Sequence, residues 1–245
     1  MNETDADVKT TLRIPGTWRH PKELMSRMPA GFRLTSQAVI LPDGIELEYT
    51  PLPPDDQFAK IFQSACRHPA TVAEMRRVNR YTVSIGLIGP GGSMAAALTT
   101  MQAGAAIVRA GGAGVFIDNS ALAHGGGDWL QMTEDGGCDA VSFVFVNVVR
   151  GRREVRTMGM HVMGFPDIVM QLSDIDDDGE VIIEVIRYLC RGEKPVGYGQ
   201  VLAGESGPRF RVLATESDQL GIARPMCNPF GRLKLVRVKD GAESN

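Results

Sequence analysis

The sequence predicts an α+β fold: a mostly antiparallel sheet built from hairpins, with helices packed on one face. Strand-like segments of alternating apolar and polar residues follow one another around turn signals. Helical segments are interspersed among them and do not alternate regularly with strands. Of the 245 residues, 43% are hydrophobic and 22% are charged. This balance is typical of a globular protein and excludes collagen-like, disordered and disulfide-scaffold classes.

The N-terminal third is predicted to begin with a tail and to continue as short helices around one hairpin. Residues 1–10 hold three acidic residues and little apolar mass, so we expect a mobile tail. Alternating residues on both sides of a Pro-Asp-Gly turn at 42–44 predict a β-hairpin. Capping and start signals predict helices in three segments: residues 21–28, residues 55–67 (capped by Asp55 and Asp56) and residues 71–78.

A strand, a glycine turn and a long helix are predicted next, over residues 81–88, 89–92 and 93–110. The helix is rich in alanine and carries larger apolar residues at core spacing. Gly104 lies inside it and would weaken an isolated helix, so we expect it to permit the close approach of a neighbour. A short buried strand is predicted over residues 115–118.

The second half is predicted to contain most of the remaining strands. We expect a long apolar strand over residues 141–149, paired with residues 154–162. The turn between them lies in a basic cluster, which we interpret as solvated and not as a phosphate site. The cluster consists of Arg150, Arg152, Arg153 and Arg156. The other predicted elements are strands over residues 166–172, 200–203, 209–214 and 233–238, and an acid-capped helix over residues 173–189.

The chain is expected to form a single α+β domain over residues 11–240, followed by a tail over residues 241–245. Glycine and acidic residues near 134–138 mark the place where two subdomains of similar size could join. An undivided domain and a domain of two subdomains are both compatible with the sequence.

Charge and residue spacing exclude several classes of partner. Lys and Arg number 26 against 29 Asp and Glu, so the formal charge is −3. This balance argues against a general nucleic-acid binder. The four cysteines form no Cys-x-x-Cys pair and the four histidines have no i, i+4 pairing, so we expect no metal and no cofactor. The first thirty residues lack the apolar segment of a secretory signal, and no stretch reads as a membrane span. We therefore expect a cytoplasmic protein without a membrane partner.

The glycine turn is the first candidate binding segment. Gly91, Gly92 and Ser93 precede a helix N-terminus, where free N–H groups can bind an anion. However, Met94 stands where a dinucleotide-binding fingerprint has its third glycine. Asp118 lies 27 residues after Gly91, later than the expected acid at about 20. A structural turn is the favoured interpretation, and a phosphate site is the alternative.

The second candidate is a polar cluster that follows the buried strand at 115–118. It contains a nominal Ser-His-Asp set, but the serine is not in a Gly-x-Ser-x-Gly turn, and closeness in sequence does not establish triad geometry. Catalysis, contact with a ligand or partner, and a purely local structural role are all open. The cluster consists of Asp118, Asn119, Ser120, His124 and Asp128.

The acidic segment from Asp174 to Glu180 resembles the start of an EF-hand calcium-binding loop. Position 12 of such a loop would be Val185, where a bidentate glutamate is needed. We therefore interpret this run as the acidic N-terminus of a helix.

Three segments resemble a family of uncharacterised bacterial proteins. They are residues 82–108, residues 115–132 with the Asn119-to-His124 motif and Asp128-Trp129, and the segment from Arg156 through Gly164-Phe165-Pro166. In these segments the sequence is similar to the domain of unknown function 4261. The resemblance implies a single bacterial α+β domain and no established activity.

No catalytic constellation reaches useful specificity, so we expect a binding or protein-interaction module with an unknown protein or small-molecule partner. The alternative is an enzyme or nucleotide-binding protein that uses residues 118–128 together with the turn at 89–93.

Overall fold

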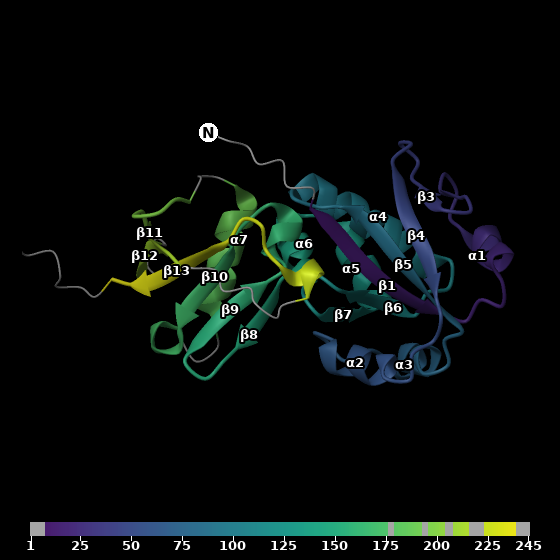
Figure 1. Ribbon diagram of the computed structural model, residues 1–245, viewed down its shortest axis with the longest axis horizontal. Coiled ribbons are helices and arrows are strands. Elements are labelled where there is room, and N and C mark those ends of the chain that lie inside the picture. The colour runs from purple at the N-terminus through teal and green to yellow at the C-terminus, as the bar shows by residue number, and fades with distance from the viewer. Residues whose placement is uncertain (1–7, 176–178, 193–195, 204–207, 216–222, 239–245) are drawn as a thin grey trace, which may run out of the picture.

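The computed structural model describes residues 8–175, 179–192, 196–203, 208–215 and 223–238. They form two mostly antiparallel sheets that lie one after the other along the long axis of the molecule, with helices around and between them (Figure 1). The predicted α+β class is therefore confirmed. Among the described residues, no helix combines the length and the apolar character needed to cross a bilayer.

The first sheet contains the strands of the N-terminal half. Its spatial order is β2 (Arg33–Leu34), β3 (Ala38–Ile40), β4 (Glu46–Leu52), β5 (Val83–Pro90), β1 (Lys9–Gly16), β6 (Gly114–Ile117) and β7 (Leu122–Gly125). The hairpin predicted around residues 42–44 is confirmed as the β3–β4 pair.

The N-terminal strand β1 occupies an interior position of this sheet. It pairs antiparallel with β5 along its full length, from Lys9 opposite Pro90 to Gly16 opposite Val83, and with β6 on its other side. The expected tail of residues 1–10 was therefore too long. Buried Val8 precedes the strand, and residues 1–7 lie outside the described part of the chain.

The second sheet contains the strands of the C-terminal half. Within the described residues, its strand pairs are antiparallel apart from β10–β13. The β8–β9 pair confirms the predicted basic hairpin, whose Gly151 amide donates to the Glu154 carbonyl. The spatial order is β11 (Val201–Ala203), β12 (Arg209–Ala214), β13 (Arg232–Arg237), β10 (Asp167–Gln171), β9 (Glu154–Met158) and β8 (Asn147–Arg150).

The helices of the first half are α1 (Pro21–Arg27), α2 (Phe58–Ala65), α3 (Val72–Val78), α4 (Met94–Arg109) and α5 (Gly126–Asp135). Ser93 caps α4 as its spacing predicts, since its hydroxyl accepts from the Ala96 amide. Asp55 does not cap α2. The helix begins three residues later, and the Asp55 carboxylate instead accepts from the Gln57 amide in the preceding turn.

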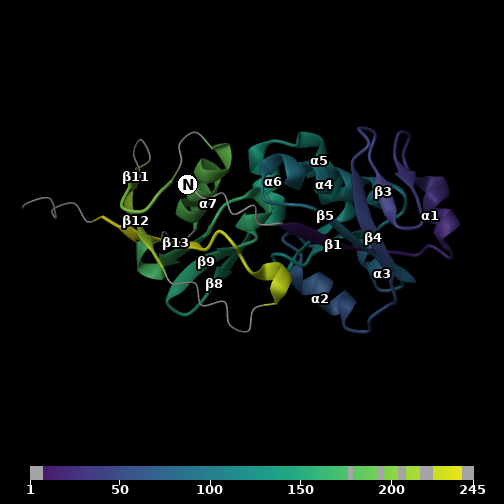
Figure 2. The ribbon, with the colours of Figure 1, turned by 45° about the horizontal axis from the view of Figure 1, so that its top comes forward.

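Helices cover both faces of the first sheet, whereas the sequence predicted helices on one face (Figure 2). Helices α4 and α5 pack on one face, and α2 and α3 pack on the other through an apolar cluster that includes Phe62 and Phe116. Successive residues Val115, Phe116 and Ile117 are all buried, so β6 is apolar on both sides. A strand of this kind needs cover on each face.

Residues 141–149 are not one strand, as the sequence predicted, but the helix α6 (Cys138–Phe145) followed by β8. Val141, Val144 and Phe145 are fully buried, and α6 packs against α4, α5 and α7 (Glu180–Arg191). A short apolar run that is buried on every side has no amphipathic period. Its composition therefore cannot distinguish a helix from a strand.

Short 3₁₀ helices complete the second half: η1 (Met160–Met163), η2 (Leu172–Asp174) and η3 (Arg224–Met226). Strand β9 ends at Met158, four residues earlier than predicted, because Gly159 adopts a positive φ and starts η1. Helix α7 begins at Glu180, and its N-cap residue is Gly179, so Ser173 and Asp174 do not cap it. The remaining acidic residues of this run, 176–178, lie outside the described residues.

One apolar core runs through both halves. It joins residues of both sheets with α4, α5, α6 and α7, and the rings of Trp129 and Phe145 meet edge to face within it. Gly104 has the packing role that was predicted, because a Cβ there would stand 3.1 Å from the Trp129 ring. The link between α5 and α6 consists of Gly136 and Gly137, inside the expected junction at 134–138.

The two halves also meet backbone to backbone at Gly164. This residue has a φ of +87°, and a Cβ there would collide with the Gly92 carbonyl oxygen. Gly164→Ala should reduce the free energy of unfolding by more than about 3 kcal/mol, because it adds a collision to the strain of a left-handed residue. Gly192→Ala is the control, since Gly192 has a φ of +65° but no neighbour within 4 Å of the new Cβ. Urea denaturation measures both, and equal losses would contradict the close contact.

Candidate functional site

The glycine turn before α4 is occupied by the protein's own backbone. The Gly91 amide donates to the Val8 carbonyl at 2.9 Å, and the Gly92 amide donates to the Val162 carbonyl at 2.9 Å. The Ser93 hydroxyl is used as the helix cap. A phosphate at this turn would find both glycine amides already paired, so the geometry agrees with a structural turn.

Asn119 lies in the β6–β7 turn, is fully buried and connects three parts of the chain. Its Oδ1 accepts from the Thr11 amide at 2.8 Å. Its Nδ2 donates to the carbonyls of Lys9 and Pro225, each at 3.0 Å, and lies 3.0 Å from His161 Nε2. The side chain therefore ties β1 to η1 and η3.

The other members of the turn point elsewhere. Asp118 forms an ion pair with Arg13 at 2.9 Å. Burial raises the pKa of the Asp118 carboxyl, and the hydrogen bond from Arg13 opposes that rise. Ser120 is fully buried, its hydroxyl has no hydrogen-bond partner within the described ranges, and its carbonyl accepts from Asn147 at 3.0 Å.

His124 is fully buried at the end of β7, beside the rings of Trp129 and Phe143. Its Nε2 lies 3.0 Å from the Val144 carbonyl oxygen at the end of α6, to which it donates in the neutral ring. Burial lowers the pKa of His124 to about 4, so the imidazole is neutral at pH 7. Asp128 lies on α5 and pairs with the exposed His68 at 3.2 Å.

The predicted cluster is therefore not assembled into a catalytic site. Asn119 and His124 are engaged with backbone groups, Asp118 forms an ion pair with Arg13, and Asp128 contacts His68. Among the residues that the structure describes, no base lies within hydrogen-bond distance of the Ser120 hydroxyl. The structure gives these residues a role in joining segments.

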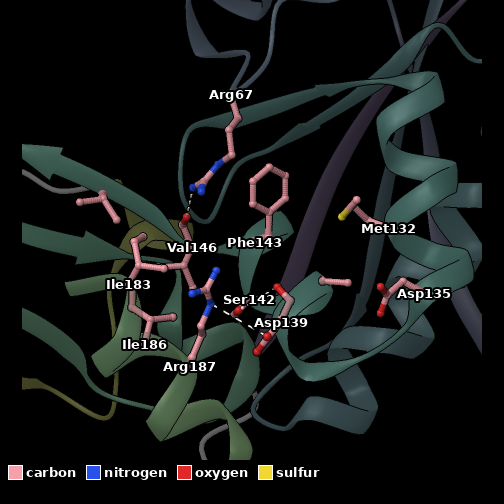
Figure 3. A pocket seen from close by; sticks show the side chains of 12 residues that line it. Arg67, Met132, Asp135, Asp139, Ser142, Phe143, Val146, Ile183, Ile186 and Arg187 are labelled. Atoms are coloured by element: carbon pink, nitrogen blue, oxygen red, sulfur yellow. Dashed lines mark hydrogen bonds and ion pairs between the residues drawn. The ribbon is translucent and has the colours of Figure 1, made fainter. Parts of the chain in front are cut away.

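Arg67, which the sequence analysis did not single out, has the least usual environment of any charged side chain described. Residues 66 and 67 run beside β7, where the Arg67 amide donates to the Ala123 carbonyl at 3.2 Å. From there the side chain reaches the end of α6, and its Nη2 donates to the Val146 carbonyl (Figure 3). The guanidinium carbon lies 4.7 Å from the centre of the Phe143 ring, a cation–π distance.

The Arg67 guanidinium has no carboxylate partner among the residues that the structure describes. Its Nε–H is buried and has no acceptor in the described part of the chain. Burial lowers the pKa of Arg67, but an arginine side chain stays charged in a protein. Most buried cations are paired, so this one marks a place where an anion would be favoured.

Two hollows of about 250 and 400 Å³ share Arg67, Val148 and Ile183 in their walls. The smaller lies among α5, α6 and α7, and the larger lies among the end of α2, the β6–β7 turn and β8. Both walls combine residues from the two halves of the chain. The site is therefore complete only when α6 and α7 are packed against the first half.

A second arginine, Arg187, lies in the wall of the smaller hollow, but its charge is balanced (Figure 3). It pairs with Glu184 at 2.7 Å and lies 4.0 Å from Asp139, which also pairs with Arg191 at 3.3 Å. The hydrogen bond from Arg187 to Glu184 raises the pKa of Arg187. Asp135 also lies in this wall, but within the described chain neither it nor Asp139 pairs with Arg67, so Arg67 is the cation of the wall that lacks a carboxylate partner there.

The sequence contains little that could have revealed Arg67. It follows an amphipathic helix directly before His68-Pro69, and basic residues at helix ends are ordinarily solvated. Only the packing of α6 beside it makes this arginine different from the other surface arginines.

The described residues contain no group of three or more His, Cys, Asp or Glu side chains placed to hold a metal ion. None of the family models, curated proteins or solved structures compared with this chain matches it. The resemblance to the domain of unknown function 4261 stays a prediction.

Asn119→Asp tests the connecting role of the turn. The new carboxylate would lose both bonds to the Lys9 and Pro225 carbonyls and face their oxygens in a buried site. We expect the free energy of unfolding to fall by about 3 kcal/mol or more at pH 7. Asn147→Asp is the control, because the half-buried Asn147 loses one such bond. Equal effects in chemical denaturation would contradict the role of Asn119.

His124 should make stability depend on pH. Between pH 6.5 and about 4 the unfolded chain binds a proton that the folded His124 does not, so stability falls as the pH falls through this window. The variant His124→Gln should lose about 2 kcal/mol less than the wild type between pH 7 and pH 5.

The other buried titratable groups are the same in the wild type and in His124→Gln, so their contributions to the pH dependence cancel in the comparison. Burial lowers the pKa of His161 to about 4, and it raises the pKa of Asp167 to about 6, which has the opposite effect on stability. The control replacement is His20→Gln at an exposed position. Parallel pH profiles for wild type and His124→Gln in urea titrations would show the prediction to be wrong.

Proposed function

We propose that this protein is a binding module whose ligand is a small molecule with an anionic group and an apolar body, held at Arg67 between the two halves. The observation that carries the proposal is a half-buried guanidinium with a fully buried Nε, without a carboxylate partner in the described chain, in the wall shared by two hollows.

The anionic group follows from the chemistry of the guanidinium. An arginine side chain has five N–H donors, of which the Val146 carbonyl takes one, and the Nε–H has no acceptor. Carboxylate and phosphate oxygens match the planar fork of such donors and form strong, charge-assisted hydrogen bonds. Either group would balance the charge that the protein leaves uncompensated.

The apolar body follows from the remaining walls of the smaller hollow. Most of its lining is aliphatic or aromatic, and a volume of about 250 Å³ suits a ligand smaller than a typical drug molecule. The apolar lining residues are Met132, Ala140, Phe143, Val146, Val148, Ile183 and Ile186.

Binding without turnover is the better-supported interpretation. Cys66 lies in the wall of the larger hollow, but burial raises the pKa of its thiol, so it is not an activated nucleophile at pH 7. The alternative enzyme or nucleotide site at residues 118–128 and 89–93 receives less support from the geometry. The Gly91 and Gly92 amides, Asn119 and Nε2 of His124 are engaged with backbone groups, and Asp118 pairs with Arg13. The proposed setting, a bacterial cytoplasm, rests on the sequence alone.

A matched pair of small ligands tests the proposal. Hexanoate offers a carboxylate on an aliphatic chain, and hexanamide has the same chain without the charge. We expect hexanoate to raise the melting temperature and to bind in calorimetry with a Kd of roughly millimolar, at least about tenfold tighter than hexanamide. Inorganic phosphate and butyl phosphate, run in parallel, distinguish a phosphate from a carboxylate ligand.

The variant Arg67→Met keeps an unbranched stem and removes the charge, so hexanoate binding should be lost. Arg76→Met on the exposed side of α3 is the control and should bind as the wild type does. The NMR signal of the Arg67 Nε–H in the wild-type protein adds a readout that does not depend on the variant folding. The proposal is overturned if hexanoate leaves that signal unmoved, or if Arg67→Met binds it normally.

A further inference from the structure

The second sheet has one face packed in the core and one face turned outward. Buried and exposed residues alternate along β12. Phe210 and Val212 are buried, and the residues at the alternate positions are exposed, namely Arg209, Arg211 and Leu213. The same alternation runs along β13. The buried positions belong to the core that includes α7.

The outward face carries more basic than acidic side chains; its carboxylates in the register are Glu154 on β9 and the buried Asp167, which lies opposite Arg232. It carries Arg156 on β9, Arg211 on β12, and Arg232 and Lys234 on β13, with Arg209 at its margin. No carboxylate pairs with Arg156, Arg211 or Lys234 within the described chain. In a protein whose formal charge is −3, this segregation of positive charge on one surface is unusual.

Aliphatic side chains separate these cations. The register places Leu213, Lys234, Val169, Arg156 and Val149 opposite one another in a single row across five strands. Next to this row, Val201, Arg211 and Val236 form a second one. Leu213 and Val201 are 38% and 40% exposed, whereas Val169 at the centre of the row is buried at 7%, so the apolar surface that a partner could reach lies mainly toward the β11–β12 edge.

From this charge complementarity we propose that the outward face of the second sheet docks an acidic polypeptide segment in which carboxylate side chains alternate with aliphatic ones. The cations would pair with the carboxylates, and the exposed valine and leucine side chains would pack against the aliphatic residues of the segment.

The alternation of cations with aliphatic side chains on this face favours a polypeptide partner over a nucleic acid. Proteins that bind single-stranded RNA or DNA on an open sheet stack the bases on aromatic side chains. The positions between the cations here are held by valine and leucine. These give no stacking platform but pack well against aliphatic side chains.

The test uses a fluorescent peptide in which Glu alternates with Val, measured by anisotropy, with a Lys-Val peptide and oligouridylate as comparisons. We expect the Glu-Val peptide to bind at least about tenfold tighter than either comparison, and the binding to weaken as salt rises. Tighter binding of oligouridylate, or no preference for Glu over Lys, overturns the proposal.

The double variant Arg211→Glu with Lys234→Glu should abolish peptide binding. A control with the same change of charge reverses the exposed Arg76 and Arg80, and it should bind as the wild type does. If the reversed variant fails to fold, the neutral pair Arg211→Gln and Lys234→Gln replaces it, with a loss of at least about tenfold expected. Unchanged peptide binding in whichever of these variants folds overturns the proposal. Arg67→Met should bind the peptide normally, which would show that the peptide does not bind in the hollow at Arg67.

Discussion

The carbonyl groups at the C-terminal end of α6 determine how the two halves meet. An α-helix leaves its last carbonyls without partners inside the helix, and α6 is buried, so the protein must supply donors for them. His124 serves the Val144 carbonyl, and Arg67 serves the carbonyl of Val146, the residue that follows α6. Both donors come from the first half, so the end of α6 is satisfied only when the halves are packed together.

This arrangement accounts for features that otherwise look unrelated. It holds a neutral histidine and a charged arginine next to the same helix end, where positive charge is favoured by the helix dipole. It also explains why Arg67 lacks a carboxylate partner in the described chain, since the carbonyl and the Phe143 ring already stabilise it. The ligand proposed for the hollow would contact the donors that remain, so its binding should strengthen the contact between the halves.

The two proposed binding surfaces are physically distinct. The hollow lies between the halves and offers the half-buried Arg67 beside mostly apolar walls, with Asp135, Asp139 and Arg187 also in its lining, and its volume suits a small ligand. The outer face of the second sheet offers several half-buried or exposed cations separated by aliphatic side chains, which suits a larger and more extended partner. A mutation at either surface should leave the other intact, because no residue belongs to both.

The sequence by itself determined the α+β class, the hairpins, and helices such as α4, whose alanine content and capping serine are local signals. It also located the polar turn at 118–120, but not the directions in which those side chains point. Three features depended on tertiary structure: the interior position of β1, the helical state of α6, and the environment of Arg67. The physical reason is shared, because each depends on neighbours that are distant in sequence. A segment buried on all sides shows no period, and an arginine shows its role only through what packs around it.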